Sequence, residues 1–134
     1  MEKRFRREIS SLHEIFDFVH HFLEENKINE SHSFTIDLVV EELFTNLVKY
    51  DPENNKDILI IINCEDKRLV VDLVDFDSKP FDLTETKEVD VHIPLEDRKI
   101  GGLGIHLVKK MVDRLDYQYL DGNAKITFMK NLEK

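Results

Sequence analysis

The sequence has little of what marks disulfide-stabilised, membrane-spanning or nucleic-acid-binding proteins. Its single cysteine, Cys64, excludes an internal disulfide and a multi-cysteine metal site, and we interpret it as an ordinary strand residue. No apolar stretch approaches the roughly 20 residues that cross a bilayer, and the charged N-terminus is not followed by a signal-peptide core. These absences predict a soluble, cytoplasmic protein that does not enter a membrane.

Positive charge is also scarce, because 28 acidic residues face only 19 Lys and Arg, for a formal net charge of −9. Phosphate backbones and anionic membranes require a basic footprint, so we expect neither as a partner. A nucleotide is not excluded, since a metal ion and backbone N–H groups can hold its phosphates. The 134 residues are 41% hydrophobic. This is enough for one core, so residues 1–134 are predicted to form a single domain.

Hydrophobic periodicity predicts two helices in the first fifty residues. Ser11 and Glu14 have the spacing of a capping box that opens the first helix, and apolar residues then recur every three or four positions. The second helix is predicted over residues 33–50, because Pro52 disfavours helical backbone in the residue before it. A weakly alternating edge strand is expected at residues 4–9.

The second half of the chain is predicted to contain two hairpins. Residues 57–64 and 68–75 form one, and residues 117–120 and 125–129 form the other around a glycine turn. Between the hairpins lies a long charged loop, residues 77–99, of a kind that is usually functional. A third helix follows it, with one apolar face made of Ile105, Val108, Met111, Val112 and Leu115. The predicted fold is α+β: a two-layer sandwich of a mostly antiparallel sheet with about three helices on one face.

Glycine is rare, and its placement is informative. Three of the four glycines, Gly101, Gly102 and Gly104, surround Leu103 directly before the third predicted helix. Glycine allows the backbone to approach a ligand closely, and a helix N-terminus offers unpaired N–H groups to phosphate. Taken alone, the motif fits a tight turn without a ligand equally well.

Two further groups of polar residues can take part in chemistry. Glu42 and Asn46 are four residues apart and share a face of the second predicted helix, whereas Glu41 projects about 100° away. An Asn oxygen can ligate Mg²⁺ and a Glu can orient or deprotonate a nucleophile, although an isolated pair is more often a solvated stripe. Asp75 and Asp77 end a predicted strand, where a carboxylate can accept a hydrogen bond from an exocyclic amine such as that of adenine. An ordinary polar turn explains these two residues equally well.

Along the chain, the Glu42–Asn46 pair comes first, the Asp75 and Asp77 carboxylates second and the glycine motif last. With this order of motifs, the sequence resembles the GHKL (Bergerat-fold) ATP-binding domains, and among them the short anti-sigma-factor serine kinases. The resemblance covers nearly the whole chain, and its most specific stretch, residues 94–113, is similar to the family's lid and second glycine box. It implies that Asn46 coordinates Mg²⁺ and that Glu42 is the general base acting on a serine hydroxyl. It also implies that the phosphates of ATP lie against Gly101, Gly102, Leu103 and Gly104.

The first glycine box departs from the family pattern. Aligning residues 80–82 with the family's Pro-Phe-Asp ending places Ser78 at the glycine position and Phe76 at the position of the adenine-binding aspartate. Asp75 and Asp77, each one residue away, are the candidates for that carboxylate. Neighbouring strand residues point to opposite faces, so neither is a direct replacement.

Two functions from different classes follow from the resemblance. The first is an ATP-binding anti-sigma-type regulator that phosphorylates a serine or threonine of a small antagonist protein and binds a sigma factor or a similar regulator. The resemblance is also consistent with a homodimer. The alternative, favoured by the altered first glycine box, is a non-catalytic partner-switching module with weak or lost ATP binding. A third function, the catalytic half of a histidine kinase, requires an upstream helix pair with a phosphoacceptor histidine, which we do not expect here.

Overall fold

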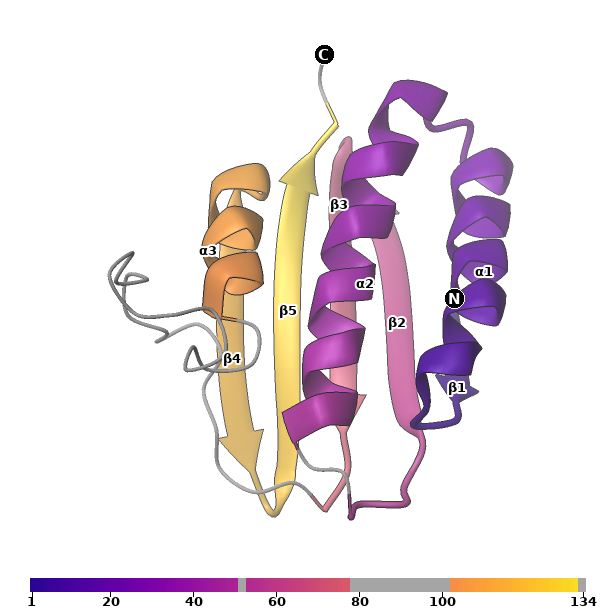
Figure 1. The fold of residues 1–134 in the computed structure, drawn as a ribbon. Coiled ribbons are helices and arrows are strands. Elements are labelled where there is room, and N and C mark those ends of the chain that lie inside the picture. The colour runs from indigo at the N-terminus through magenta and orange to yellow at the C-terminus, as the bar shows by residue number, and fades with distance from the viewer. Residues whose placement is uncertain (51–52, 78–101, 133–134) are drawn as a thin grey trace.

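The computed structural model describes residues 1–50, 53–77 and 102–132, and for residues 102 and 103 only the backbone is described (Figure 1). Residues 51–52, 78–101 and 133–134 lie outside the described part. The predicted loop at residues 77–99 therefore falls outside it except for its first residue, and so does Gly101.

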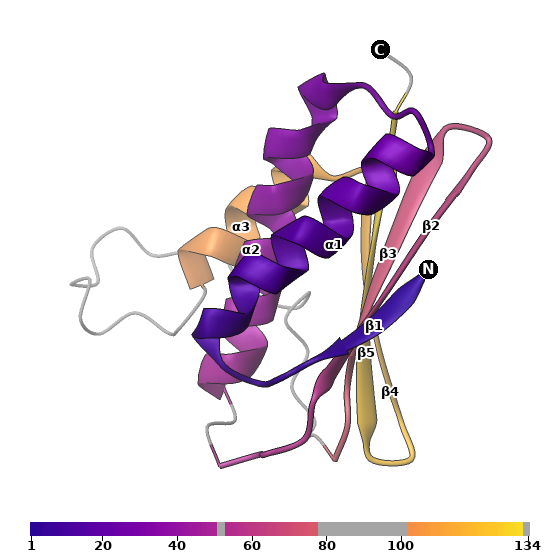
Figure 2. The ribbon, with the colours of Figure 1, turned by 90° about the vertical axis from the view of Figure 1, so that its right-hand side faces the viewer.

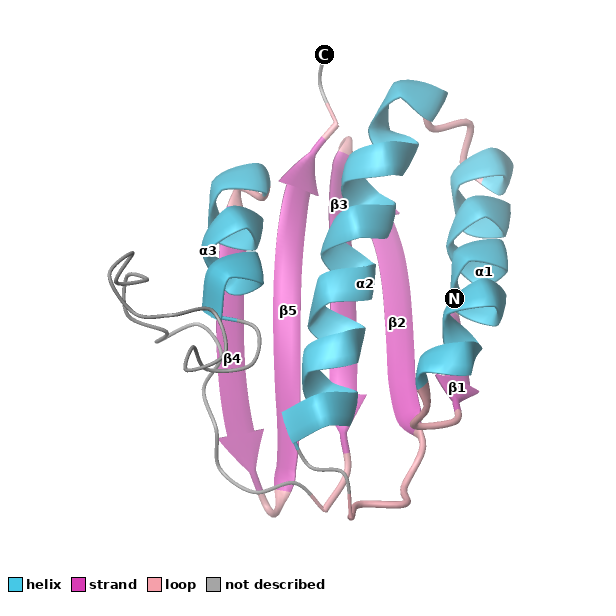
Figure 3. Cartoon of the chain, in the orientation of Figure 1, coloured by secondary structure: helices cyan, strands magenta, loops and turns pink. Residues whose placement is uncertain are grey.

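Five strands form one antiparallel sheet in the order β1-β2-β3-β5-β4 (Figure 3). Their bounds are Glu2–Phe5 for β1, Ile58–Glu65 for β2, Arg68–Asp75 for β3, Arg114–Leu120 for β4 and Asn123–Asn131 for β5. Every neighbouring pair is antiparallel, and the two predicted hairpins are β2–β3 and β4–β5. The strand β3 thus lies at the centre of the sheet, with its carboxyl end at Asp75.

Helices α1 (Leu12–Glu25), α2 (Ser33–Tyr50) and α3 (Gly102–Met111) lie on one face of this sheet (Figure 2). Two short 3₁₀ turns, Ile9–Ser11 and Glu30–His32, precede α1 and α2. The predicted α+β sandwich is confirmed, and the bounds of α2 are those expected from the sequence. Among the described residues, no helix combines the length and apolar character needed to cross a membrane.

The core fills the space between the two layers. Alternate strand residues point toward the helices, as the pleat requires, and they are fully buried: Ile58, Ile60, Ile62, Leu69, Val71, Leu73, Ile126 and Phe128. The helices contribute apolar stripes at three- and four-residue spacing, which include Ile15, Val19, Ile36, Val40, Leu43 and Leu47. Burial of this apolar surface, at about 25 cal/mol per Å², is the main term that fixes α2 over the middle of the sheet.

Two expectations at the N-terminus were wrong. The edge strand is β1, Glu2–Phe5, rather than residues 4–9, because the chain turns away after Phe5 and the Glu8 N–H donates to the Arg6 carbonyl at 2.8 Å. Ser11 makes no side-chain cap on α1. It has helical backbone angles, and its hydroxyl instead donates to the Arg6 carbonyl at 2.8 Å.

The predicted third helix was too long at its carboxyl end. The helix α3 ends at Met111, and Leu115 lies in β4 opposite Phe128 of β5. The Asp113 N–H donates to the Met129 carbonyl at 2.9 Å, so pairing with β5 begins directly after the helix. Leu115 still packs on the core, which is why its hydrophobic spacing resembled a helical one.

Candidate nucleotide-binding site

Glu42 and Asn46 lie one turn apart in the carboxyl-terminal half of α2. Asn46 is only 2% exposed. Its amide nitrogen donates to the Glu42 carbonyl at 2.5 Å and to the Glu42 carboxylate oxygen Oε2 at 2.7 Å. The same-face arrangement predicted from the four-residue spacing is thus present, whereas Glu41 is exposed.

The other polar atom of the Asn46 side chain, Oδ1, is buried and has no hydrogen-bond partner among the described residues. The amide cannot be reversed without cost, because Oδ1 would then face two oxygens of Glu42. A buried, unpaired oxygen costs about 1–3 kcal/mol unless something binds it. A side-chain amide oxygen is a ligand that suits Mg²⁺. The chemistry at this position therefore fits a hard cation.

The amino-terminal turn of α3 packs directly against Glu42. A Cβ placed on Gly104 would overlap the carboxyl group of Glu42, so only glycine fits here while Glu42 holds this position. Gly102 is the first residue of the helix, and its backbone and that of Leu103 lie in the same turn. The structure thus brings together Glu42, Asn46 and the glycine turn, whose N–H groups and partial positive charge suit phosphate.

Asp75 and Asp77, the two candidates for the base-recognising carboxylate, occupy very different environments. Asp75 is the last residue of β3, faces the helices and is 1% exposed. Asp77 lies beyond the strand in a left-handed conformation with φ of 52°. Its side chain is 70% exposed, with its carboxylate 3.8 Å from the Lys56 ammonium. Phe76, between them, contacts the Arg4 guanidinium, whose carbon lies 4.8 Å from the ring centre.

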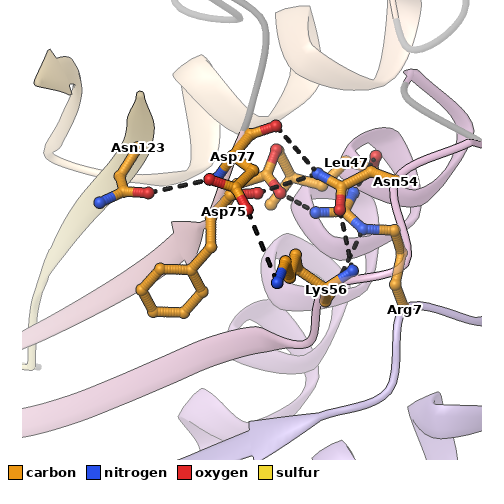
Figure 4. Close-up of polar contacts among 8 residues, drawn as sticks. Arg7, Leu47, Asn54, Lys56, Asp75, Asp77 and Asn123 are labelled. Carbon is orange, nitrogen blue, oxygen red and sulfur yellow. Dashed lines mark hydrogen bonds and ion pairs between the residues drawn. The ribbon is translucent and has the colours of Figure 1, made fainter. Parts of the chain in front are cut away.

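Sequence reasoning missed Arg7, which holds the end of β3 in place (Figure 4). Its side chain is 3% exposed and forms an ion pair with Oδ1 of Asp75. The remaining donors of the guanidinium reach two backbone carbonyls: Nη1 donates to Leu47 at 3.0 Å and Nε to Lys56 at 3.2 Å. One side chain therefore joins α2, the segment before β2 and the end of β3.

No local pattern marks Arg7 in the sequence. It stands in a charged N-terminal segment that normally remains in water, and its partners are 40 and 49 residues away. The second carboxylate oxygen of Asp75, Oδ2, is buried and has no hydrogen-bond partner among the described residues. The site thus contains two unsatisfied buried oxygens, one on α2 and one at the end of β3.

The surrounding connections also have specific partners. The Asn54 amide donates to the Phe76 carbonyl at 2.9 Å, and the Asp77 N–H donates to Asn123 Oδ1 at 3.2 Å (Figure 4). These bonds tie the segment before β2 and the start of β5 to the chain that leaves β3. They fix the position of the chain at Asp77, where the described segment 53–77 ends.

Comparison with known proteins agrees with this fold. The solved structures that share it include two described here. One contains the RsbU and RsbW domains of Rv1364c from Mycobacterium tuberculosis, with a TM-score of 0.67 and 14% identity over 100% of this chain and 32% of that one. The other is the SiaB–SiaC complex from Pseudomonas aeruginosa, with a TM-score of 0.62 and 13% identity over 97% of this chain and 88% of that one. No curated protein sequence matches the chain significantly.

At these identities the structural matches establish the fold alone, and the chain spans about a third of the first structure's length. The family model is more informative. The model of the histidine kinase-like ATPase domain matches residues 5–130, which include Glu42, Asn46, Asp75 and the glycine turn. The chain therefore belongs to the family of histidine kinase-like ATPase domains.

Proposed function

We propose that this protein binds Mg-ATP between α2 and the start of α3 and acts as an anti-sigma-type regulator with serine/threonine kinase activity on a small antagonist protein. The observation that carries the proposal is the buried, unpaired Oδ1 of Asn46, which lies beside a carboxylate packed on Gly104. A metal–phosphate ligand would satisfy that oxygen. The family membership and the resemblance to anti-sigma kinases support the same assignment.

Each residue of the site has a defined role in this proposal. Asn46 ligates the cation through Oδ1, and the N–H groups of Gly101, Gly102, Leu103 and Gly104 hold phosphate oxygens. Asp75 or Asp77 accepts a hydrogen bond from the exocyclic amine of the base. When bound, Mg²⁺ would neutralise charge on the phosphates, which is a main requirement of phosphoryl transfer.

Glu42 is proposed to act as the general base. Its Oε2 accepts from Asn46, which leaves Oε1 to accept the proton of a serine or threonine hydroxyl. The hydroxyl oxygen then forms a bond to the γ-phosphorus, the bond to the β-phosphate oxygen breaks, and ADP leaves. The hydrogen bond from Asn46 restricts the rotation of the carboxylate, so the base and the metal ligand keep a fixed relation.

Protein partners are proposed from the likeness of fold. One structural neighbour is a complex of SiaB with SiaC, and the other includes an RsbW domain. By likeness of fold, we propose an antagonist-type partner and a sigma factor or similar regulator for this chain, in the cytoplasm. A non-catalytic partner-switching module is the second candidate. It is favoured by Phe76 and Ser78 at the positions where the family pattern has its aspartate and glycine.

Isothermal titration calorimetry with ATP, in the presence and absence of Mg²⁺, tests the nucleotide proposal. We expect saturable, Mg²⁺-dependent binding, and at least a tenfold loss of affinity in Asn46→Ala, since a tenfold change corresponds to about 1.4 kcal/mol. Glu41→Ala, five residues earlier on α2 and exposed, is the matched control and should bind like the wild type. Absence of binding by the wild-type protein would remove the proposal.

Transfer is tested separately, with labelled ATP and a small antagonist-type protein as the phosphate acceptor. We expect label on a serine or threonine of that protein, and loss of about 10²–10⁴-fold in rate for Glu42→Gln, the usual contribution of a general base. Glu41→Gln should keep its rate. ATP binding without any transfer would favour the non-catalytic module.

A further inference from the structure

The guanidinium of Arg7 is built into the protein interior rather than left on the surface. All three of its nitrogens are engaged: Nε with the Lys56 carbonyl, Nη1 with the Leu47 carbonyl and Nη2 with Asp75. Arginine stays charged in proteins, so a side chain only 3% exposed requires a buried counter-charge. Asp75 supplies that charge as a carboxylate.

This arrangement connects the two unsatisfied oxygens of the candidate site. Leu47 directly follows Asn46, so the α2 turn that presents Asn46 Oδ1 is also the turn that Arg7 contacts. The same guanidinium holds Oδ1 of Asp75. The planar fork of an arginine fixes the angle between its partners, which a lysine cannot do. Arg7 therefore determines the position of the Asp75 carboxylate relative to the α2 turn that carries Asn46.

Only one oxygen of Asp75 is used by this pair. Oδ2 is buried and has no hydrogen-bond partner among the described residues. An ionised carboxylate is an acceptor only, so Oδ2 requires a donor. Asp77 does not offer an equivalent acceptor, because its carboxylate is exposed and lies near the Lys56 ammonium.

We propose that Arg7 is a positioning residue of the nucleotide site, which aims Asp75 Oδ2 at a C6 amine of the base and so makes the site selective for 6-aminopurine nucleotides. The inference rests on the proposed nucleotide binding and goes beyond it. It assigns base recognition to Asp75 rather than Asp77, and it makes that recognition depend on a residue that contacts no nucleotide. A base with a 6-oxo group, such as hypoxanthine, places an acceptor against Oδ2 and is rejected.

The test compares the affinities of Mg-ATP and Mg-ITP, because the two nucleotides differ only in the 6-amino or 6-oxo group and in the proton that the 6-oxo base carries on N1. We expect the wild-type protein to prefer ATP at least tenfold, since a hydrogen bond to a charged group is worth about 1.5–3 kcal/mol. Arg7→Lys keeps the positive charge but loses the planar guanidinium. Asp75→Asn keeps the shape of the side chain but replaces a carboxylate, which only accepts hydrogen bonds, with an amide that also donates them. In both variants the ATP-to-ITP preference should fall toward one.

A loss of stability in Arg7→Lys has to be separated from a loss of base recognition, so a matched control is needed. Leu23 is 3% exposed at the far end of α1. Leu23→Ala weakens the core away from Arg7, and it should keep the wild-type ATP-to-ITP preference even where its melting temperature falls as far as that of Arg7→Lys. A change in the preference is therefore a readout that loss of stability alone does not produce.

The outcomes separate this inference from the proposed function. Binding of neither nucleotide by the wild-type protein would overturn both. Binding of ATP and ITP with equal affinity, or an unchanged preference in Arg7→Lys, would overturn the role of Arg7 alone. If Arg7→Lys does not fold, the Arg7 Nε–H resonance of the wild-type protein decides. The chemical shift of this resonance should change when Mg-ATP is added and change less with Mg-ITP, and equal changes would overturn the inference.

Discussion

The two ends of the candidate site are built by different means. At the α2–α3 end, Glu42 and Asn46 are four residues apart and meet a glycine turn through backbone contact. At the β3 end, Asp75 is held by Arg7, which enters from the connection between β1 and α1. The first end is encoded by short spacings and glycine placement, and the second by a side chain that contacts three separate segments.

This difference shows that a sequence motif can identify one end of a site and leave the other end unmarked. In the proposed site, the α2–α3 end would supply groups for metal and phosphate, which many nucleotides share. The β3 end would supply the buried acceptor that distinguishes one base from another. On this proposal the less recognisable end determines selectivity, and it contains the most deeply buried ion pair among the described residues.

The largest expected effect is on stability, at the β3 end. Arg7→Met leaves the Asp75 carboxylate buried without its counter-charge, which typically destabilises a protein by about 3–5 kcal/mol. The free energy of unfolding in urea measures this loss. The Arg7→Met/Asp75→Leu double variant removes both charges and should recover much of it, because buried ion pairs are often replaceable by apolar residues.

The control for this prediction is the exposed ion pair between Lys56 and Asp77, near the Arg7–Asp75 pair. Lys56 and Asp77 are 57% and 70% exposed and 3.8 Å apart. Lys56→Met should change the free energy of unfolding by no more than about 1 kcal/mol, as is usual for surface pairs. Equal losses in Lys56→Met and Arg7→Met would contradict the account of the β3 end.

A smaller effect on stability is expected at the α2–α3 end. In Gly104→Ala the new methyl group displaces the Glu42 carboxyl, which is the flexible end of a side chain and can rotate away. The better helix propensity of alanine offsets this by up to about 1 kcal/mol, so the free energy of unfolding should change little. The hydrogen bond from Asn46 to Glu42 Oε2 is lost, however, and phosphoryl transfer should fall.

The Asn46 side-chain amide resonances report that displacement directly. They should shift in Gly104→Ala, and they should not shift further when Gly104→Ala is added to a Glu42→Ala background, where no carboxyl remains to displace. Unchanged amide resonances in Gly104→Ala would mean that Gly104 does not constrain Glu42.

The sequence was sufficient for the elements whose signals are local. The bounds of α2 follow from its apolar stripe and from Pro52, and the hairpins follow from alternation and turn residues. The resemblance led us to expect Glu42 and the glycine turn at one site, whereas the direct contact between Gly104 and Glu42 is a finding of the structure. In these cases the residues that determine the structure lie within a few positions of each other.

The errors arose where contacts outside the motif itself override its spacing. Ser11 has the pattern of a cap, but a preceding 3₁₀ turn places it inside the helical backbone. Leu115 has helical spacing, but pairing with Phe128 draws it into β4. Arg7 looks like a solvated charge, and only the folded chain brings Asp75 to it. No periodicity contains information of this kind, because it depends on which segments become neighbours.

The most direct test of the central claim is a titration of ¹⁵N-labelled protein with Mg-ATP, followed by NMR. We expect saturable shifts at both ends of one site: the Asn46 side-chain amide, the Gly104 amide and the Asp75 amide, together with the Arg7 Nε–H. Shifts grouped instead around the surface cavity of about 520 Å³ lined by residues that include Lys27, His32 and Lys67 would contradict the claim, as would the absence of any shift.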